Sequence, residues 1–415
     1  MVPMKRVVIV ASGRSYRTGD FLAAAALLQV EAVVASDVAA PIPGVQLQID
    51  LADPAAASAV IGALDPSPDA VVAIDDQGVA VAARAAQDLG LGHNPLGAIA
   101  ATRDKLLMRE LLAAGRVPQP RFAPVPSGAG PAVAAELGFP VVIKPVALAA
   151  SQGVIRADDP AAVRRAEARI RTMLDQAEMD ADQALLAEEY LPGAELVVEG
   201  LLFAGRLEVL AIIDKPDPME GPFFEETLLV TPSRHDAAVQ DAAVAVAAAG
   251  IEALGLVTGP VHAEIRVDPD GSVRLLEVAA RSIGGLCGRA LSFGLVGESL
   301  EVIVLRSALG MPTLDTSPAR PAAGVLMLPI PATGVLTAVE GVDVVEALEQ
   351  IDAVTLTVSP GRRVTALPEG DRYLGFVFAG GADAAEVEET LRIAGSSLTV
   401  VVDGEGMTKP VLPPR

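Results

Sequence analysis

The chain has 415 residues, 51% of them apolar, so it is long enough to form two or three domains with separate cores. Lysine and arginine number 31 against 53 aspartates and glutamates, which gives a formal net charge of −22. Such a negative surface repels nucleic acid and anionic membranes, so we expect neither as a partner. The single cysteine, Cys287, excludes a disulfide scaffold and a cysteine-based zinc site, and we expect its thiol to be buried.

The N-terminal part alternates short apolar strands with alanine-rich helices, an order that predicts a parallel sheet. A turn at 11–15 follows the first strand and lacks the G-x-G-x-x-G pattern, which argues against a dinucleotide site. Asp75 and Asp76 end the third strand, where they could contact a ligand or, as we favour, cap the next helix. The strands are predicted at 6–11, 32–36 and 70–74, and the helices at 19–28, 55–64 and 79–89.

The apolar runs are too short for export or for spanning a membrane. The run that follows Lys5 and Arg6 stops at Ser12, too soon for a signal peptide. The run at 244–256 is interrupted by Glu252, and no uncharged apolar run reaches the roughly 18 residues of a membrane span. We therefore expect a soluble, cytoplasmic protein.

Strands return after residue 322, at 324–328, 354–358 and 374–379, and a helix is predicted at 384–394. Asp383 with Glu386 forms a capping box at the start of this helix. Together these elements predict a small α+β domain. Proline-rich stretches around 118–131 and 317–321 mark internal boundaries.

A β-hairpin carries the first candidate site. Residues 261–267 alternate apolar and polar side chains, and 268–271 is a turn signal. With those four residues as the loop, Glu264 opposes Leu275 and lies one diagonal step, about 7–8 Å between Cα atoms, from Glu277. Two carboxylates across that gap can share Mg²⁺, which prefers oxygen ligands. The alternative is a solvated polar face, although the apolar neighbours of Glu277 make an unpaired charge there costly.

Two lysines lie where an anion is expected. Lys105 falls in the first turn of a helix predicted to begin at Thr102, where the helix dipole disfavours a cation unless an anion binds. Lys144 ends a buried-strand pattern at 139–145 and needs an anionic partner, because lysine is almost never buried alone. The small residues of 147–154 could place backbone N–H groups on phosphates. The alternatives are a solvated lysine and a plain surface loop.

A third candidate segment, 184–195, reads as a strand that leads into a turn. It could offer one carbonyl and one N–H group to an adenine edge. Glu195 could accept hydrogen bonds from the ribose hydroxyls. Taken alone, it would be an exposed acidic strand end.

The order of these features resembles the ATP-grasp superfamily over essentially the whole chain. Within it the chain looks most like the L-amino-acid ligases of the bacilysin-synthetase type, which join two amino acids; the segments 215–226, 277–285 and 374–391 are similar to that group. The resemblance implies an α/β (α+β) ATP-grasp fold. Its parts would be a Rossmann-like domain at 1–100, an ATP-grasp domain at 101–320 with a lid at about 118–190, and a C-terminal α+β domain at 321–415.

The resemblance implies a role for each matched residue. The phosphate-binding set is Lys105, Lys144 and the loop of Ser151, Gln152, Gly153 and Val154, which would close over the γ-phosphate. The nucleotide-binding set is Glu188, Glu189, Tyr190, Leu191 and Glu195. In this set the backbone of Glu189 and Leu191 would bind adenine, and Glu195 would bind the ribose. The metal set is Glu264 and Glu277, for one or two Mg²⁺ ions that Mn²⁺ could replace. Ala279 stands where many such enzymes have asparagine, so the number of ions stays open.

The same resemblance implies an ATP-dependent carboxylate–amine ligase that forms an amide, as in a dipeptide of L-amino acids, through an acyl phosphate. The catalytic set is Arg281, Lys144 and His262, and the substrate-binding set is Glu226, His262, Arg281, Gly284 and Gly285. Glu226 or His262 could accept the amine's proton, and Arg281 or Arg289 could bind a substrate carboxylate. A homodimer is expected.

Three alternatives stay open. A purine-pathway ATP-grasp ligase would also capture an acyl phosphate with an amine. A biotin-carboxylase-like enzyme is less favoured, because the turn at 11–14 and the loop at 149–153 lack that group's Asn-Arg-Gly-Glu turn and glycine run. The third alternative is a non-catalytic nucleotide-binding protein.

Overall fold

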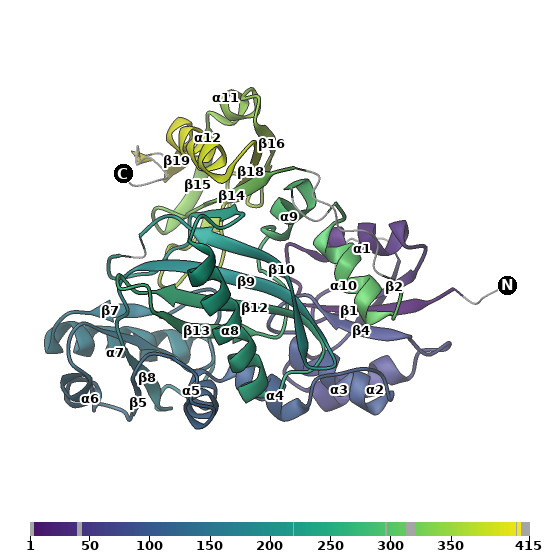
Figure 1. Cartoon of the computed structure of the whole chain (residues 1–415), viewed down its shortest axis with the longest axis horizontal. Helices are drawn as coiled ribbons and strands as arrows, with labels where there is room; N and C mark the ends of the chain where they lie inside the picture. Colours follow the sequence, from purple (N-terminus) through teal and green to yellow (C-terminus); the bar gives the residue numbers. More distant parts are fainter. Residues whose placement is uncertain are drawn as a thin grey trace.

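The computed structural model describes residues 4–39, 44–218, 220–294, 297–312, 320–403 and 405–407. Figure 1 shows the N-terminal strands on the right, a large sheet in the centre, a smaller lobe at the lower left and the C-terminal elements at the top. The described strands form four sheets. Met219 and most of the proline-rich stretch at 317–321 lie outside the described residues.

The N-terminal sheet is parallel, with the strand order β3-β2-β1-β4, which confirms the predicted fold class. Apolar side chains cover both of its faces, as a doubly covered parallel sheet requires. The edge strand β3 was not predicted, because it has only four residues, three of them exposed. The elements are β1 (Arg6–Ala11), α1 (Thr18–Leu27), β2 (Glu31–Ser36), β3 (Val45–Gln48), α2 (Pro54–Gly62), β4 (Ala70–Ala73) and α3 (Val79–Asp88).

Two short helices, α4 (Leu96–Arg103) and α5 (Lys105–Ala114), lead to the lower-left lobe, and the boundary between them corrects one prediction. Thr102 belongs to α4, and its hydroxyl donates to the Ile99 carbonyl. Asp104 is the N-cap of α5 instead, because its carboxylate accepts hydrogen bonds from the Leu106 and Leu107 backbone. Lys105 nevertheless begins this helix.

The lower-left lobe is an antiparallel sheet with the order β5-β8-β6-β7, covered by two helices. Its strands are β5 (Phe122–Val125), β6 (Val141–Lys144), β7 (Ile155–Ala157) and β8 (Leu185–Glu189), and its helices are α6 (Gly130–Leu137) and α7 (Pro160–Gln176). Because β6 and β8 pair in the middle of this sheet, Lys144 and Glu188 come from adjacent strands.

The central sheet has eight strands in the order β13-β12-β9-β10-β11-β14-β18-β16. It crosses residue 320 without a break, because β11 pairs with β14 along four residues. Its strands are β9 (Ala194–Phe203), β10 (Arg206–Lys215), β11 (Leu228–Thr231), β12 (Gly259–Val267), β13 (Val273–Ala279), β14 (Ala322–Leu328), β16 (Ile351–Leu356) and β18 (Gly375–Gly381).

Helix α8 (Ala237–Leu254) lies along this sheet in Figure 1. Its length and composition alone would allow it to cross a membrane. In the structure, however, Ala243, Ala247 and Ile251 are buried against residues of β9, β12 and β13, as in a core helix. We therefore read α8 as part of the protein core.

The C-terminal elements form a further small sheet, β17-β15-β19-β20, with two helices. Asp383 accepts hydrogen bonds from the backbone of Ala385 and Glu386, and Glu386 accepts one from Ala382, so the predicted capping box is present. The elements are β15 (Gly334–Glu340), α11 (Val342–Glu346), β17 (Arg363–Val364), α12 (Ala384–Ser397), β19 (Thr399–Val402) and β20 (Glu405–Met407).

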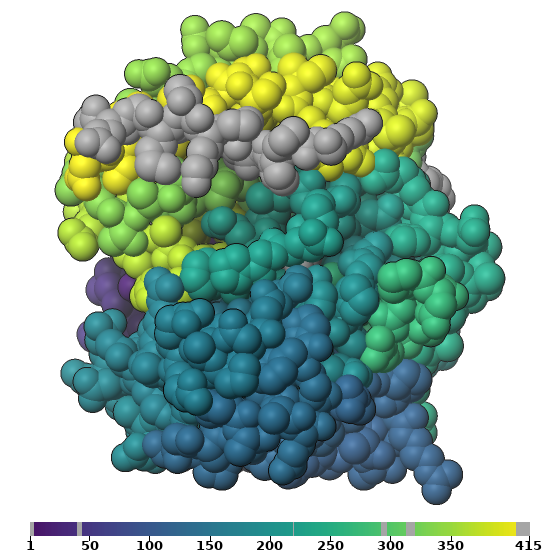
Figure 2. Space-filling view, turned by 90° about the vertical axis from the view of Figure 1, so that its left-hand side faces the viewer, coloured from purple at the N-terminus to yellow at the C-terminus, as the bar shows by residue number. Residues whose placement is uncertain are grey.

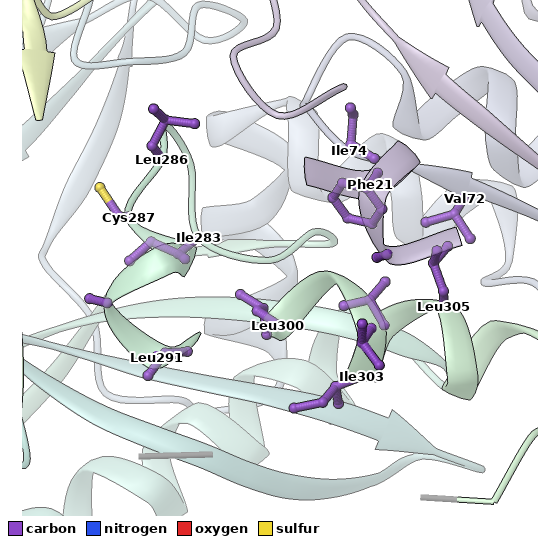
Figure 3. Close-up of a cluster of buried hydrophobic side chains, with 14 of the residues drawn as sticks. Phe21, Val72, Ile74, Ile283, Leu286, Cys287, Leu291, Leu300, Ile303 and Leu305 are labelled. Carbon is purple, nitrogen blue, oxygen red and sulfur yellow. The ribbon is translucent and has the colours of Figure 1, made fainter. Parts of the chain in front are cut away.

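Helices α9 (Gly288–Gly294) and α10 (Leu300–Ala308) join the central sheet to the N-terminal sheet. Figure 3 shows Leu300, Ile303 and Leu305 of α10 close to Phe21 and Val72 of the N-terminal part. Cys287 lies in the same core, and burial raises the pKa of its thiol, as expected for a core cysteine. This packing fixes the segment that leads from β13 into α9, which borders the cavity described next.

Candidate active site

A cavity of about 620 Å³ lies where the N-terminal sheet, the small antiparallel sheet and the central sheet meet. Figure 2 shows the small antiparallel lobe in blue and the C-terminal part in green and yellow, with teal residues of the central sheet between them. Gly153 is the predicted site residue that does not line the cavity. The structure brings the other predicted residues together around it: Lys105, Lys144, Ser151, Gln152, Val154, Glu188, Glu189, Tyr190, Leu191, Glu195, Glu226, His262, Glu264, Glu277, Arg281, Gly284 and Gly285.

Lys144 is buried at one end of this cavity beside a carboxylate that it shares with an arginine. Its Nζ lies 2.7 Å from Glu188 Oε2, and Arg109 Nε lies 2.6 Å from Glu188 Oε1. Burial and the nearby Arg109 and Lys105 lower the pKa of Lys144. Burial alone would raise the pKa of Glu188, but Arg109 and Lys144 outweigh it and lower that pKa to about 2. The Glu188 carboxylate therefore anchors Lys144.

Lys105 reaches the same end from α5. Its Nζ donates to the Leu148 carbonyl at 2.7 Å and lies 3.5 Å from Glu277 Oε1. The small-residue loop that it holds also contacts the C-terminal part, because the Gly153 backbone donates to Pro368 and the Gln152 amide donates to Glu369. This loop thus bridges two lobes above the cavity.

Tyr190 and the residues beside it form the strand-to-turn segment at the cavity edge. The Glu189 carboxylate points to Arg121 and Arg274, at 2.8 and 2.9 Å, and the Glu189 backbone N–H donates to the Arg121 carbonyl. The Tyr190 ring stacks on Phe224, with ring centroids 6.3 Å apart. This segment provides a flat aromatic wall at the cavity edge.

The hairpin register differs from the predicted one. Glu264 pairs directly with Glu277, because Val267 pairs with Val273 and a bulge follows Leu275. The bulge has a tertiary cause: the Arg109 guanidinium donates to the carbonyls of Leu275 and Leu276, and therefore turns them away from the ladder. The two carboxylates are cross-strand neighbours rather than diagonal ones.

A second buried lysine, Lys215, lies at the other end of the cavity among carboxylates. Its Nζ contacts Glu195 and Glu226 and lies 3.6 Å from Glu264 Oε1. Arg266 also binds Glu195, at 2.8 Å, so the Glu195 carboxylate is buried between two cations. Burial alone would lower the pKa of Lys215, but the three carboxylates raise it well above its ordinary value.

Glu195, Glu226 and Glu264 hold oxygen atoms within 4.8 Å of one another, which is close enough for a metal ion. The Lys215 ammonium already contacts all three residues. Glu264 and Glu277 fit Mg²⁺ better, since they are cross-strand carboxylates that line the cavity and each lies 3.5 Å or more from a lysine.

His262 is held on both sides of its ring. Its Nδ1 lies 2.9 Å from Glu199 Oε2, and its Nε2 lies 3.5 Å from Glu264 Oε1. Burial alone would lower the pKa of His262, but these two carboxylates raise it to about 9. The imidazole is therefore a cation at neutral pH.

Arg281 points into the cavity, and Asp76 holds its Nε at 2.9 Å. Asp75 accepts hydrogen bonds from the backbone of Gly78 and Ser12. Gly78 is the N-cap of α3, which has no side-chain cap, so the favoured capping interpretation is wrong, and both aspartates line the cavity. Arg289 forms a bidentate pair with Asp20 at 2.7 and 3.0 Å and does not line the cavity. Of the two arginines considered for a substrate carboxylate, only Arg281 faces the cavity.

Sequence reasoning missed several cavity residues. Lys215 carried the same signal as Lys144, a lysine at the end of an apolar strand, and could have been found. The supporting residue Arg109 lies within a helix and gave no local signal. Glu225 and Tyr373 also line the cavity, and their approach depends on how distant segments pack.

Two parts of the chain match family models. Residues 137–290 match the model of an ATP-grasp domain, and residues 326–403 match L-amino acid ligase C-terminal domain 2. The solved L-amino acid ligase from Bacillus licheniformis superimposes with a TM-score of 0.80 at 24% identity, covering 96% of this chain and 99% of that one.

Two sequence relatives match over shorter stretches. Carnosine synthase 1 of Gallus gallus is 36% identical over 35% of this chain and 16% of its own length. Alanine–anticapsin ligase of Bacillus subtilis is 28% identical over 52% of this chain and 49% of its own length. The chain thus spans half or less of each of these two relatives.

Proposed function

From the premise that the chain is an ATP-grasp protein with an L-amino acid ligase C-terminal domain, we propose that it joins a carboxylate to an amine at the expense of ATP. The product would be an amide, with two L-amino acids as substrates and a dipeptide as product. ADP and phosphate would be released. We propose that it works in the cytoplasm as a homodimer.

The observation that carries the proposal is the convergence of Lys105, Lys144 and Arg281 on one cavity with the Glu264–Glu277 pair. The lysines supply positive charge for the phosphates of ATP, and the turn at Tyr190 supplies backbone groups and an apolar wall for adenine. A low-dielectric cavity makes such fixed charges effective, because water does not screen them.

In the proposed reaction, a carboxylate oxygen attacks the γ-phosphorus in line and ADP leaves, which forms an acyl phosphate. Lys144 and Arg281 offset the charge that spreads over the transferring group. The loop at Ser151 keeps water from the intermediate, and its contacts with the C-terminal part hold it over the cavity. The amine then attacks the acyl carbon, and phosphate leaves.

Glu264 and Glu277 would hold Mg²⁺. When bound, the ion would neutralise charge on the phosphate oxygens, and Mn²⁺ could replace it. Ala279 offers no ligand atom at the position next to this pair, so the proposal leaves the number of ions open.

The test supplies ATP, Mg²⁺ and pairs of amino acids, and measures ADP, phosphate and a dipeptide. We expect Glu277→Gln and Arg281→Ala each to lower kcat about 10²–10³-fold, since each removes a charge aimed at the transition state. Arg206→Ala, at an exposed residue outside the cavity, is the control. Release of AMP and pyrophosphate, or near-wild-type rates in both variants, would refute the proposal; bicarbonate-dependent turnover would favour a carboxylase.

A further inference from the structure

The attacking amine must lose a proton, and the two groups that the sequence suggested for this task are already engaged. The Glu226 carboxylate contacts the Lys215 ammonium, and both nitrogens of His262 face carboxylates. The ammonium beside Glu226 opposes protonation of that carboxylate, and the imidazole between its two carboxylates already carries a proton on each nitrogen, so neither group is a ready acceptor. If the proposed ligase reaction is correct, another acceptor is required.

Glu225 lines the cavity beside Glu226 and lacks such a partner. It lies in the segment between Pro222 and β11, half-buried, and accepts a hydrogen bond from the Ile330 backbone. Within the residues that the structure describes, no lysine, arginine or histidine forms an ion pair with Glu225. Burial raises its pKa to about 7, and the single N–H group only partly opposes this.

The phenol of Tyr373 interacts electrostatically with the carboxylates of both Glu225 and Glu226. Burial and these two carboxylates raise the pKa of Tyr373 well above its ordinary value, so the phenol is neutral and does not compete for the proton. Lys215, a cation of the same cavity, is shared among Glu195, Glu226 and Glu264. Glu225 is therefore a cavity carboxylate whose charge is not already compensated.

We propose that Glu225 is the general base that takes the proton from the substrate ammonium before it attacks the acyl phosphate. Glu225 lines the same cavity as the proposed metal pair and is the chain neighbour of Glu226, which contacts Lys215 and, through Lys215, Glu264. This inference rests on the proposed function.

The protons balance as follows. The acceptor enters as an ammonium with three protons, and Glu225 accepts the first, which leaves a lone pair for the acyl carbon. The new C–N bond forms as the C–O bond to phosphate breaks. One of the two remaining protons passes to the departing phosphate and the other stays on the amide nitrogen. Glu225 then releases its proton to water.

The test compares two nucleophiles: an amino group that must lose a proton to a base before it attacks, and one that is already neutral. Hydroxylamine is already neutral at pH 7, so it can capture an acyl phosphate unaided and gives a hydroxamate. In the full-length enzyme with ATP, Mg²⁺ and a carboxylate substrate, we expect Glu225→Gln to slow amide formation about 10²-fold or more. Hydroxamate formation should stay within about twofold of wild type, since the first half-reaction does not use Glu225.

The controls keep the inference open to refutation. Glu220→Gln changes an exposed carboxylate in the same segment and should alter neither product. Glu225→Asp keeps a carboxylate and should retain more amide formation than the glutamine variant. Unchanged amide formation in Glu225→Gln, or equal loss of amide and hydroxamate, would overturn the role of Glu225. Failure of the wild-type enzyme to form any hydroxamate would instead overturn the proposed function, and this inference with it.

Discussion

The two buried lysines of the cavity, Lys144 and Lys215, have opposite surroundings. Lys144 shares one carboxylate, Glu188, with Arg109, and its pKa is lowered. Lys215 contacts three carboxylates, and its pKa is raised. The same side chain therefore shares a single counter-ion with an arginine at one end of the cavity and has several counter-ions at the other.

This difference indicates which end of the cavity can bind an anion. The Lys144 end needs added negative charge, which the phosphates of ATP would bring, whereas the Lys215 end is already neutralised and stabilises the protein itself. A buried lysine is thus a sign of anion binding only where its neighbours leave it under-compensated. Variants at the two lysines should separate these roles.

The largest effect is expected for Lys215→Met. Removing this ammonium leaves the carboxylates of Glu195, Glu226 and Glu264 facing one another, so the free energy of unfolding should fall by about 3–5 kcal/mol. Denaturant unfolding without ligand measures it. Lys144→Met is the matched control. It should lower the free energy of unfolding by about 1 kcal/mol or less, because the Glu188 carboxylate still pairs with Arg109. Equal losses in the two variants would contradict the comparison.

Lys144→Met should instead impair turnover. Loss of one fixed charge on the phosphates corresponds to about 10²–10³-fold in kcat, or roughly 3–4 kcal/mol of the barrier. Steady-state ADP release measures it. A variant with wild-type kcat and altered stability would show that Lys144, like Lys215, has only a structural role.

The smallest expected effect is on the pH dependence of the protein's stability. It tests the carboxylate-rich end of the cavity. The pKa of His262 is about 9 in the folded protein, above its ordinary 6.5, so its stabilisation is complete below pH 6.5 and is lost as pH rises through 9. We expect the free energy of unfolding to fall by about 1–3 kcal/mol across this window. His262→Gln should flatten the dependence of the free energy of unfolding on pH. His93→Gln, which changes a residue outside the cavity, should leave this dependence as in the wild type. Parallel curves for all three proteins would contradict this assignment.

Local sequence patterns predicted much of the fold. The bounds of β1 agree residue for residue, because an apolar run between polar ends leaves little choice. The parallel N-terminal sheet followed from the alternation of strands and helices. By contrast, β3 was missed, since it is an edge strand of four residues whose alternation of apolar and polar side chains is too short to stand out.

The sequence predicted many residues that line the cavity, but not how they pair. Lys105, Lys144, Glu264 and Glu277, predicted from position and from the family resemblance, all line it. The hairpin register was wrong for two reasons: Val267 pairs with Val273 rather than Ser272 at the turn, and a bulge follows Leu275. At that bulge Arg109, a helix residue more than 150 positions earlier, donates to the Leu275 carbonyl. Likewise, nothing local to Glu188 or Glu195 shows that their carboxylates bind cations of the protein itself. Such contacts depend on tertiary packing.

The continuous pairing of β11 with β14 has a practical consequence for protein engineering. A fragment that ends near residue 320, an apparent boundary for a domain exchange, would lack β14. It would therefore expose β11 as an open strand edge, which is a template for aggregation. Chimeras that graft a different C-terminal part should therefore carry β14 and its partner β18 as a unit matched to β11. The sheet, rather than the linker, sets the boundary of an exchangeable module.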